Sequence, residues 1–207
     1  MSRGSLPIVL LVAVLAGCVA GPSATVTVTV PPSPSAPDPT SPSPAAPAST
    51  SPAAPSVPPS AGARDVSGFH VVDFASPSGR IWCGMRADLT LCHFPFGYAG
   101  EVPDSEEVCP GEGLDVTGVS LTSEGPGYFC SGDPQAMPDR GTPQVAWRRG
   151  TGFPFVSFDG HSLATLPYGE SLRYLTVICS SEPSGISCGD DSTGRGFRVA
   201  RADVVLF

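Results

Sequence analysis

Apolar and polar residues alternate with a period of two along most of the chain beyond residue 68. This is the period of a strand whose side chains point in turn to a buried and a solvated face, whereas an amphipathic helix repeats its apolar positions about every 3.6 residues. Short apolar runs bounded by Gly, Pro, Asp and Ser predict strands at Phe69–Phe74, Arg80–Met85, Leu89–Phe94, Leu114–Leu121, Phe153–Phe158, His161–Leu166, Leu172–Cys179, Gly185–Cys188, Gly196–Arg201 and Asp203–Phe207. We therefore expect an all-β domain, built as a small sandwich or a partly open barrel and stapled by disulfides.

Two local signals add detail to this pattern. Asp159-Gly160 stands between two predicted strands, and Asp-Gly is a preferred pair for a two-residue hairpin turn because both residues tolerate positive φ. The acidic run Asp104–Glu107 is the one stretch with helical character, and it predicts no more than about one turn. The apolar run at residues 203–207 predicts a paired strand there.

The first residues form one uninterrupted apolar stretch, Leu6–Leu15, that follows the positive Arg3. A stretch of this length is typical of a secretory signal and is too short to span a bilayer. It ends in Leu15-Ala16-Gly17-Cys18, which resembles a bacterial lipobox, where the Cys thiol carries a diacylglycerol and the chain is cut just before that Cys. We expect a lipoprotein of the cell envelope in which residues 1–17 are removed and Cys18 anchors the chain to the outer face of the cytoplasmic membrane. The alternative is cleavage of an ordinary signal after Cys18-Val19-Ala20.

Residues 18–62 are dominated by Pro, Ser, Ala and Thr and include one charged residue, Asp38. A segment of this composition cannot bury enough apolar surface to fold, so we expect a disordered linker that extends as polyproline II. The alternation Thr25–Val30 has the pattern of a strand, but Pro31-Pro32 bounds it. The remaining residues, 63–207, are enough for one domain with a single core.

The net charge is −8, and the chain contains no lysine. Binding to nucleic acid through a broad basic face is therefore not expected. The membrane is the expected partner, through the lipid on Cys18, together with an envelope protein or a wall glycan. No motif indicates a cofactor.

Six cysteines remain when Cys18 is set aside, and all of them lie in the predicted domain. An even number outside the cytoplasm indicates disulfides, although six cysteines allow 15 connectivities. Eight residues separate Cys83 from Cys92 and also Cys179 from Cys188, which favours two hairpin clips and leaves Cys109 to pair with Cys130. A metal site would need Cys-x-x-Cys or Cys/His spacing, and the sequence has neither, so no metal ligand is assigned.

Several short motifs follow one another through the domain. They are Ser76-Pro77-Ser78-Gly79 with Ile81 and Cys83, Phe129-Cys130-Ser131-Gly132-Asp133, Leu166-Pro167-Tyr168-Gly169, Gly185-Ile186-Ser187-Cys188, and Gly194-Arg195-Gly196-Phe197 with Arg201 and Leu206-Phe207. In this ordered set the chain from Val66 to Phe207 resembles a family of small secreted or lipid-anchored actinobacterial proteins that has no established function. The resemblance implies an exported location, six paired cysteines and an all-β domain, and it supplies no catalytic residue. The chain departs from the family at Arg80, where Asn is common, and at about residues 134–162, which look like an insertion.

Trp147-Arg148-Arg149 lies inside this apparent insertion and is the one place in the domain where two basic residues are adjacent. Trp and Arg are enriched at binding interfaces, so these three residues are a candidate binding patch. The alternative is a strand that buries its Trp in the core and exposes both arginines at a turn before Gly150. A second tryptophan, Trp82, is expected in the core against the disulfide of its neighbour Cys83.

No pattern in the sequence demands catalysis, and no catalytic residue is assigned. Gly185–Gly189 matches Gly-x-Ser-x-Gly, but that motif needs a helix after it and a later histidine, and the last histidine is His161. His70, His93 and His161 stand on separate predicted strands, so a Ser/His/Asp site would have to assemble across a sheet. We expect a non-enzymatic binding module on a long stalk. The alternative is a hydrolase that acts on envelope glycan or lipid.

Overall fold

The computed structural model describes residues 55–207. Cys18, the predicted signal peptide and the alternation Thr25–Val30 lie outside the described residues, so lipid attachment stays a prediction. Among residues 55–207, no helix combines the length and the apolar character that crossing a membrane would require.

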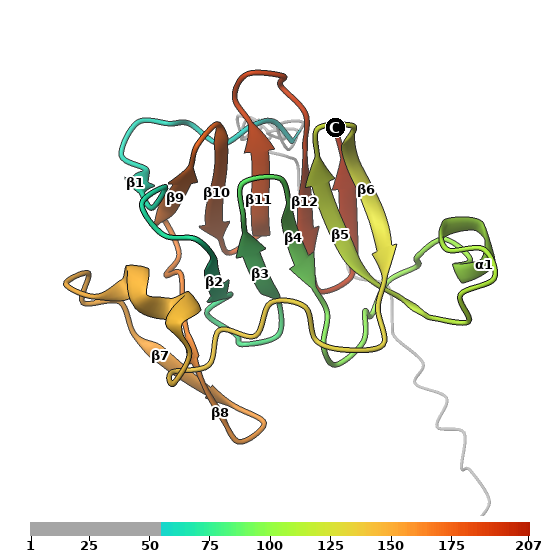
Figure 1. Ribbon diagram of the computed structural model, residues 1–207, viewed down its shortest axis with the longest axis horizontal. Helices are drawn as coiled ribbons and strands as arrows, with labels where there is room; N and C mark the ends of the chain where they lie inside the picture. The colour runs from blue at the N-terminus through green and yellow to red at the C-terminus, as the bar shows by residue number, and fades with distance from the viewer. Residues whose placement is uncertain (1–54) are drawn as a thin grey trace, which may run out of the picture. The chain divides into compact units, whose positions relative to one another are not determined.

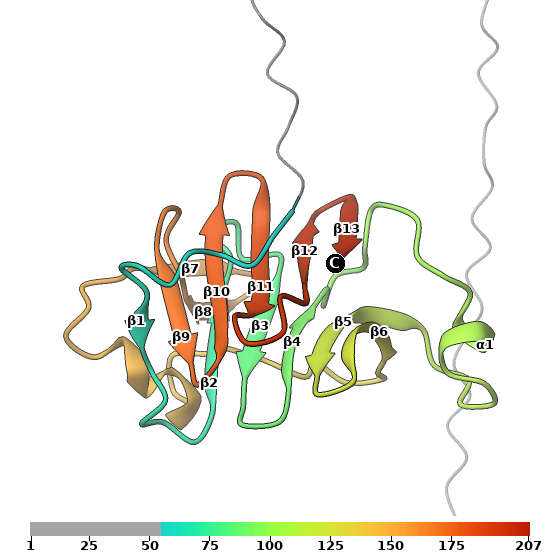
Figure 2. The same ribbon diagram turned by 90° about the horizontal axis from the view of Figure 1, so that it is seen from above.

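Two mainly antiparallel sheets pack face to face and form the body of the domain (Figure 1, Figure 2). One sheet has five strands, in the order β2 (Val72–Ala75), β3 (Trp82–Met85), β4 (Thr90–His93), β5 (Val116–Thr122) and β6 (Gly125–Cys130). The other has six, in the order β1 (Arg64–Asp65), β9 (Ser171–Tyr174), β10 (Val177–Glu182), β11 (Gly185–Asp190), β12 (Gly196–Ala200) and β13 (Asp203–Leu206). Both sheets are open, which confirms the all-β prediction in its sandwich form.

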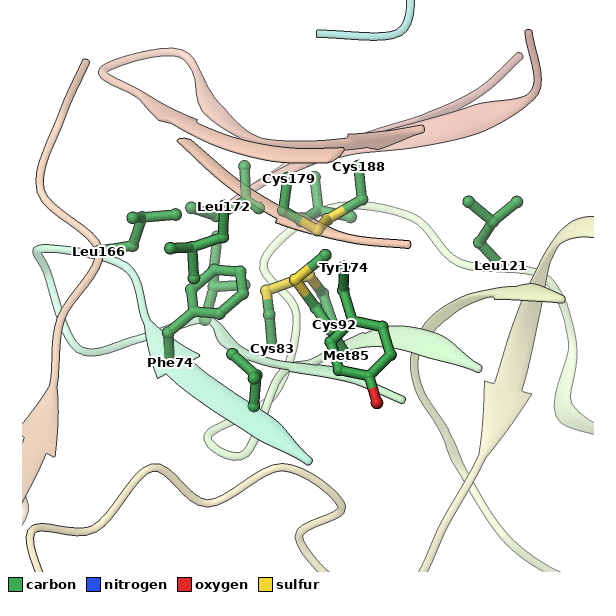
Figure 3. Close-up of a cluster of buried hydrophobic side chains, with 14 of the residues drawn as sticks. Phe74, Cys83, Met85, Cys92, Leu121, Leu166, Leu172, Tyr174, Cys179 and Cys188 are labelled. Atoms are coloured by element: carbon green, nitrogen blue, oxygen red, sulfur yellow. A yellow bond between two sulfur atoms is a disulfide. The ribbon is translucent and has the colours of Figure 1, made fainter. Parts of the chain in front are cut away.

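The core between the sheets contains two disulfides that face each other. Cys83–Cys92 joins β3 to β4, and Cys179–Cys188 joins β10 to β11. In each pair the cysteines are directly opposite in the strand register, with Cα atoms 4.0 and 4.1 Å apart. All four side chains are fully buried, and Figure 3 shows the two sulfur pairs meeting between the sheets.

The third disulfide, Cys109–Cys130, ties the loop that contains the single helical turn α1 (Ser105–Val108) to the end of β6. Its Cα atoms are 6.3 Å apart. The pairing predicted from the cysteine spacing is therefore confirmed for all three disulfides, and so is the helical turn. Asp104 begins this turn by accepting a hydrogen bond from the backbone N–H of Glu106 at 2.8 Å.

Residues 134–165, the apparent insertion and the residues just after it, pack against β2 and against the outward side of β3, and Figure 1 shows η1 and the β7–β8 hairpin beside β2. They form the 3₁₀ helix η1 (Pro143–Arg148) and a separate hairpin of β7 (Phe155–Phe158) and β8 (His161–Ala164). Asp159 and Gly160 make the turn of this hairpin with φ of 48° and 80°, as predicted from the Asp-Gly pair. We call residues 134–165 the cover.

Trp82 is buried, but on the face of β3 opposite to the one predicted. Its ring packs with Ala75 and Leu163 beneath the cover, in a cluster separate from the core between the sheets. Successive residues of a strand point to opposite faces, so the residue beside an inward Cys83 has to point outward. The predicted packing of Trp82 against the disulfide was therefore wrong.

The run Leu172–Cys179, predicted as one strand, is divided between two. β9 ends at Tyr174 and β10 begins at Val177, and Leu175 turns the chain with a φ of 54°. Leucine has no preference for this conformation, so the sequence carries no turn signal here. Three elements were not predicted: β1 has two residues, β6 contains Gly and Pro, and the two buried residues of η1, Val145 and Trp147, are spaced by two as in a strand.

The last residues of the predicted linker belong to the domain. Residues 55–62 cross the outer face of the six-stranded sheet toward β1, as Figure 2 shows. Pro58 is buried, and Val57 lies so close to β11 that a Cβ on Gly189 would be 2.9 Å from its Cγ2. The folded part therefore begins earlier than the predicted boundary at residue 63.

Candidate functional site

Turns from both sheets surround a pocket of about 300 Å³ at one end of the sandwich, which we call the end pocket. The turns are those between β2 and β3, between β10 and β11, and between β12 and β13, together with the loop from β8 to β9. Ile81 and Ile186 contribute apolar surface. The polar lining residues are Ser76, Ser78, Arg80, Tyr168, Glu182 and Arg201.

Two of these turns contain the same tripeptide, Pro-Ser-Gly, and both need its glycine. Gly79 has a φ of 74°, and a Cβ there would lie 2.8 Å from the Cβ of Phe158. Gly185 has a φ of 133°, and a Cβ there would collide with the backbone carbonyl of Val199. Glycine thus lets one turn approach β7 and the other approach β12 closely enough to form the walls of the pocket.

The polar groups of the end pocket differ in how firmly they are held. Ser76 is buried, and its Oγ accepts a hydrogen bond from the backbone N–H of Ile81 at 3.2 Å and lies 3.0 Å from the Oγ of Ser78. The guanidinium of Arg80 lies 5.1 Å from the ring centroid of Phe158. Arg80 is thus held against the cover, while its side chain is exposed to solvent.

The remaining groups are open to solvent. Tyr168 is 51% exposed, and Glu182 and Arg201 are also exposed. An exposed aromatic ring beside hydroxyl, carboxylate and guanidinium groups can stack on the flat face of a small ring and exchange hydrogen bonds with its substituents. The end pocket therefore suits a polar ligand that carries several hydroxyl groups.

Residues from four of the motifs that carry the family resemblance line this pocket. They are Ser76, Ser78 and Ile81, then Tyr168, then Gly185 and Ile186, and finally Arg201. These motifs are spread over more than a hundred residues of sequence, and each contributes a turn or a strand end. The motifs are visible in the sequence, but the sequence does not show that they meet, because their meeting depends on how the two sheets pack.

The predicted patch Trp147-Arg148-Arg149 is divided by the structure. Trp147 is 3% exposed, belongs to the core, and donates a hydrogen bond from its Nε1 to the backbone oxygen of Asp73 at 2.9 Å. It lies in η1 and not in a strand. A surface role for Trp147 was therefore wrong, because its ring fills the space beside β2. Arg148 is partly exposed and Arg149 is exposed.

No hydrogen bond joins two histidines among residues 55–207. Burial lowers the pKa of His93 to about 4, so its imidazole is neutral at pH 7. Its Nδ1 has no hydrogen-bond partner among the described residues. His93 lines a pocket of about 260 Å³ that also includes Asp115, Ser131 and Asp133.

A hydrogen bond from histidine to serine, which a Ser/His/Asp site needs, does not occur among residues 55–207. Ser131 Oγ instead donates to the backbone oxygen of Asp133 at 2.6 Å and accepts from Gln135 Nε2 at 2.8 Å. His161 Nδ1 lies 3.1 Å from Asp139 Oδ2, a pair without a serine. The Gly-x-Ser-x-Gly segment is strand β11, with Cys188 in a disulfide.

Comparison of the chain with protein-family models, with curated proteins and with solved structures gave no match. The end pocket is therefore interpreted from its own residues.

Proposed function

We propose that this chain is a lipoprotein of the outer face of the cytoplasmic membrane, anchored through Cys18, whose all-β domain is a non-enzymatic binding module. The lipobox-like Leu15–Cys18 and the long Pro-rich segment after it support the anchor and the stalk. An aromatic ring, two arginines, a carboxylate and two hydroxyls around one end pocket support a binding role. The proposed ligand is a wall glycan, whose rings and hydroxyl groups fit this lining.

One observation carries the proposal: a single pocket gathers the exposed Tyr168 and the polar side chains of separate motifs. Binding that depends on stacking should fail when the ring is removed. We expect Tyr168→Ala to weaken binding of the full chain to isolated cell-wall glycan about tenfold, which corresponds to about 1.4 kcal/mol. The measurement is co-sedimentation with insoluble glycan over a range of protein concentrations.

Phe96→Ala is the matched control, because Phe96 is an aromatic residue of similar exposure, 41%, that does not line the end pocket. Full binding by Phe96→Ala and weak binding by Tyr168→Ala support the end pocket. Equal binding by Tyr168→Ala and the unchanged chain would refute it. Release of Cys18→Ala from the membrane fraction tests the anchor independently.

The pocket around His93 supports the second candidate, a hydrolase that acts on envelope glycan or lipid. A neutral, unpartnered imidazole near Ser131 and two aspartates is chemically able to accept a proton. In that case His93→Ala should abolish hydrolysis of wall glycan or of a nitrophenyl ester while the fold is kept. Two results would refute this candidate. One is that His93→Ala still hydrolyses the substrate, and the other is that the unchanged chain shows no hydrolysis.

A further inference from the structure

A pocket of about 180 Å³ lies between η1 and β7 and is lined by three arginines. Arg140 precedes η1, Arg148 ends it, and Arg149 follows it, while Phe155 comes from β7. Thr142 and Ala146 also line it. We call this the arginine pocket. It shares no lining residue with the end pocket, and the proposal below does not depend on the proposed function.

Two of the cations lie over the ring of Phe155. The guanidinium carbon of Arg148 lies 3.9 Å from the ring centroid of Phe155, and that of Arg140 lies 4.4 Å from the same point. The two carbons are therefore no more than 8.3 Å apart, the sum of these distances. Contact with an aromatic face orients a guanidinium and leaves its N–H edges free to bind.

No carboxylate lines the arginine pocket. The nearest acid in sequence, Asp139, is instead hydrogen-bonded to His161 Nδ1 at 3.1 Å. Elsewhere in the described chain Arg173 is paired with Asp191, and Arg198 with Asp203. Three arginines thus share one pocket without a counter-charge from a lining residue, in a protein whose net charge is −8.

Arg148 also carries a polar atom that the protein leaves unsatisfied. Its Nε is buried and has no hydrogen-bond partner among the described residues. A buried donor without an acceptor is unfavourable, but this atom is closed to solvent, so a ligand in the pocket would meet the terminal N–H groups of the guanidinium instead. The crowding of positive charge in the pocket favours an anion.

We infer that the arginine pocket binds a phosphate group. A phosphate monoester carries a charge of about −1.5 to −2 at pH 7 and presents three acceptor oxygens, so it matches several guanidinium groups better than a single carboxylate does. Free phosphate and the headgroup of a phospholipid share this chemistry. Arg140 and Arg149 contact the group from solvent-exposed positions, and Arg148 contacts it from the wall of the pocket.

Calorimetric titration of the full Cys18→Ala chain with inorganic phosphate, at constant ionic strength set by chloride, tests the inference. We expect saturable binding that Arg149→Gln and Arg140→Gln each weaken about tenfold, since each removes a hydrogen bond between charged groups. Arg64→Gln is the matched control. Arg64 is exposed and its guanidinium lies 5.7 Å from the ring centroid of Phe153, but it does not line the arginine pocket. Affinity of Arg64→Gln should equal that of the parent chain.

Arg148→Lys keeps the charge and removes the flat guanidinium, so it should also weaken binding, with thermal unfolding as the check on its fold. Vesicles of phosphatidylcholine with and without phosphatidic acid identify the source of the phosphate. Binding to phosphatidic acid that free phosphate displaces assigns a headgroup, and binding of free phosphate alone assigns a soluble ligand. Absence of saturable binding in both arms, or an equal loss in Arg64→Gln and Arg149→Gln, would overturn the inference.

Discussion

The two sheets of the sandwich share one inward arrangement and differ in their outer faces. Each contains five consecutive strands in meander order, β2 to β6 and β9 to β13, with a disulfide between the second and third. The opposing residues along these two ladders are Phe74, Cys83, Cys92, Val119 and Tyr128 in one sheet and Leu172, Cys179, Cys188, Phe197 and Leu206 in the other. The same register around the same cross-link explains why the two disulfides meet in the middle of the core.

Outside this ladder the sheets differ in the segment that covers the outer face of each. The cover packs on β2 and β3, and every residue of β2, β3 and β4 is buried. Residues 55–62 cross the six-stranded sheet, where β10 has four consecutive buried residues but β9 alternates between buried and partly exposed residues. A strand covered on both faces needs no polar positions, and a strand with one solvated face keeps them. The arginine pocket lies in the cover, so the cover both buries part of a sheet face and contains a candidate binding site. The predictions below test how far the two sheets are equivalent.

The largest effect should come from loosening the cover. Trp147→Ala removes a buried indole and its hydrogen bond to the Asp73 carbonyl, and we expect the free energy of unfolding to fall by about 3–5 kcal/mol. Trp147→Phe keeps most of the ring and loses the N–H, so its loss should be smaller, about 1–3 kcal/mol. Urea unfolding followed by circular dichroism measures both variants. If Trp147→Ala lowers the free energy of unfolding by less than about 1 kcal/mol, Trp147 does not hold the cover against β2.

The shared ladder predicts that removing either buried disulfide lowers the free energy of unfolding by the same amount. Both close loops of the same sequence separation, 9 residues, so the chain-entropy estimate is about 2.5–3 kcal/mol for each. The variants are Cys83→Ala with Cys92→Ala, and Cys179→Ala with Cys188→Ala, compared by the same urea unfolding. A loss about twice as large in one sheet as in the other would contradict the equivalence of their inward faces.

The smallest expected change in stability depends on pH and belongs to Asp73 of the five-stranded sheet. Asp73 is 4% exposed, and burial raises the pKa of its carboxyl from 3.8 to about 6, against the opposing influence of Arg86. The carboxyl ionises first in the unfolded chain, so its stabilising contribution is complete below pH 3.8 and is lost as the pH rises through about 6. Relative to Asp73→Asn, the parent should lose about 2–3 kcal/mol between pH 4 and pH 7.

The contribution of His93 to stability changes with pH in the opposite direction. Its pKa is lowered, so the contribution is lost as the pH falls through about 4. Comparing Asp73→Asn with the parent cancels the effect of His93, which both share. Asp191→Asn, just after β11 of the six-stranded sheet, is the matched control, since the pair with Arg173 is partly exposed and should contribute no more than about 1 kcal/mol. A parent and Asp73→Asn whose stabilities keep a constant difference from pH 4 to pH 7 would refute the buried-acid account.

The prediction of the fold succeeded where the signal was local. Alternation in runs such as Leu89–Phe94 and the Asp159-Gly160 turn depend on neighbouring residues, and both were predicted. The prediction failed at Leu175, where a non-glycine residue turns the chain, and at β6, where Gly and Pro form a strand. At these two positions pairing with adjacent strands overrides local preference.

The sequence by itself determined an all-β domain and three disulfides. Two of these disulfides join cysteines with the same separation in sequence. Periodicity and spacing are properties of the chain, so they can be read from it directly. The tertiary structure alone decided which face each side chain takes: the cover buries Trp82, Trp147 of the cover is itself buried beside β2, and Arg140 and Arg148 both lie over the ring of Phe155. It also decided that four separate motifs surround one pocket. These outcomes depend on how one layer packs on another, and packing between distant segments leaves no periodic trace in the sequence.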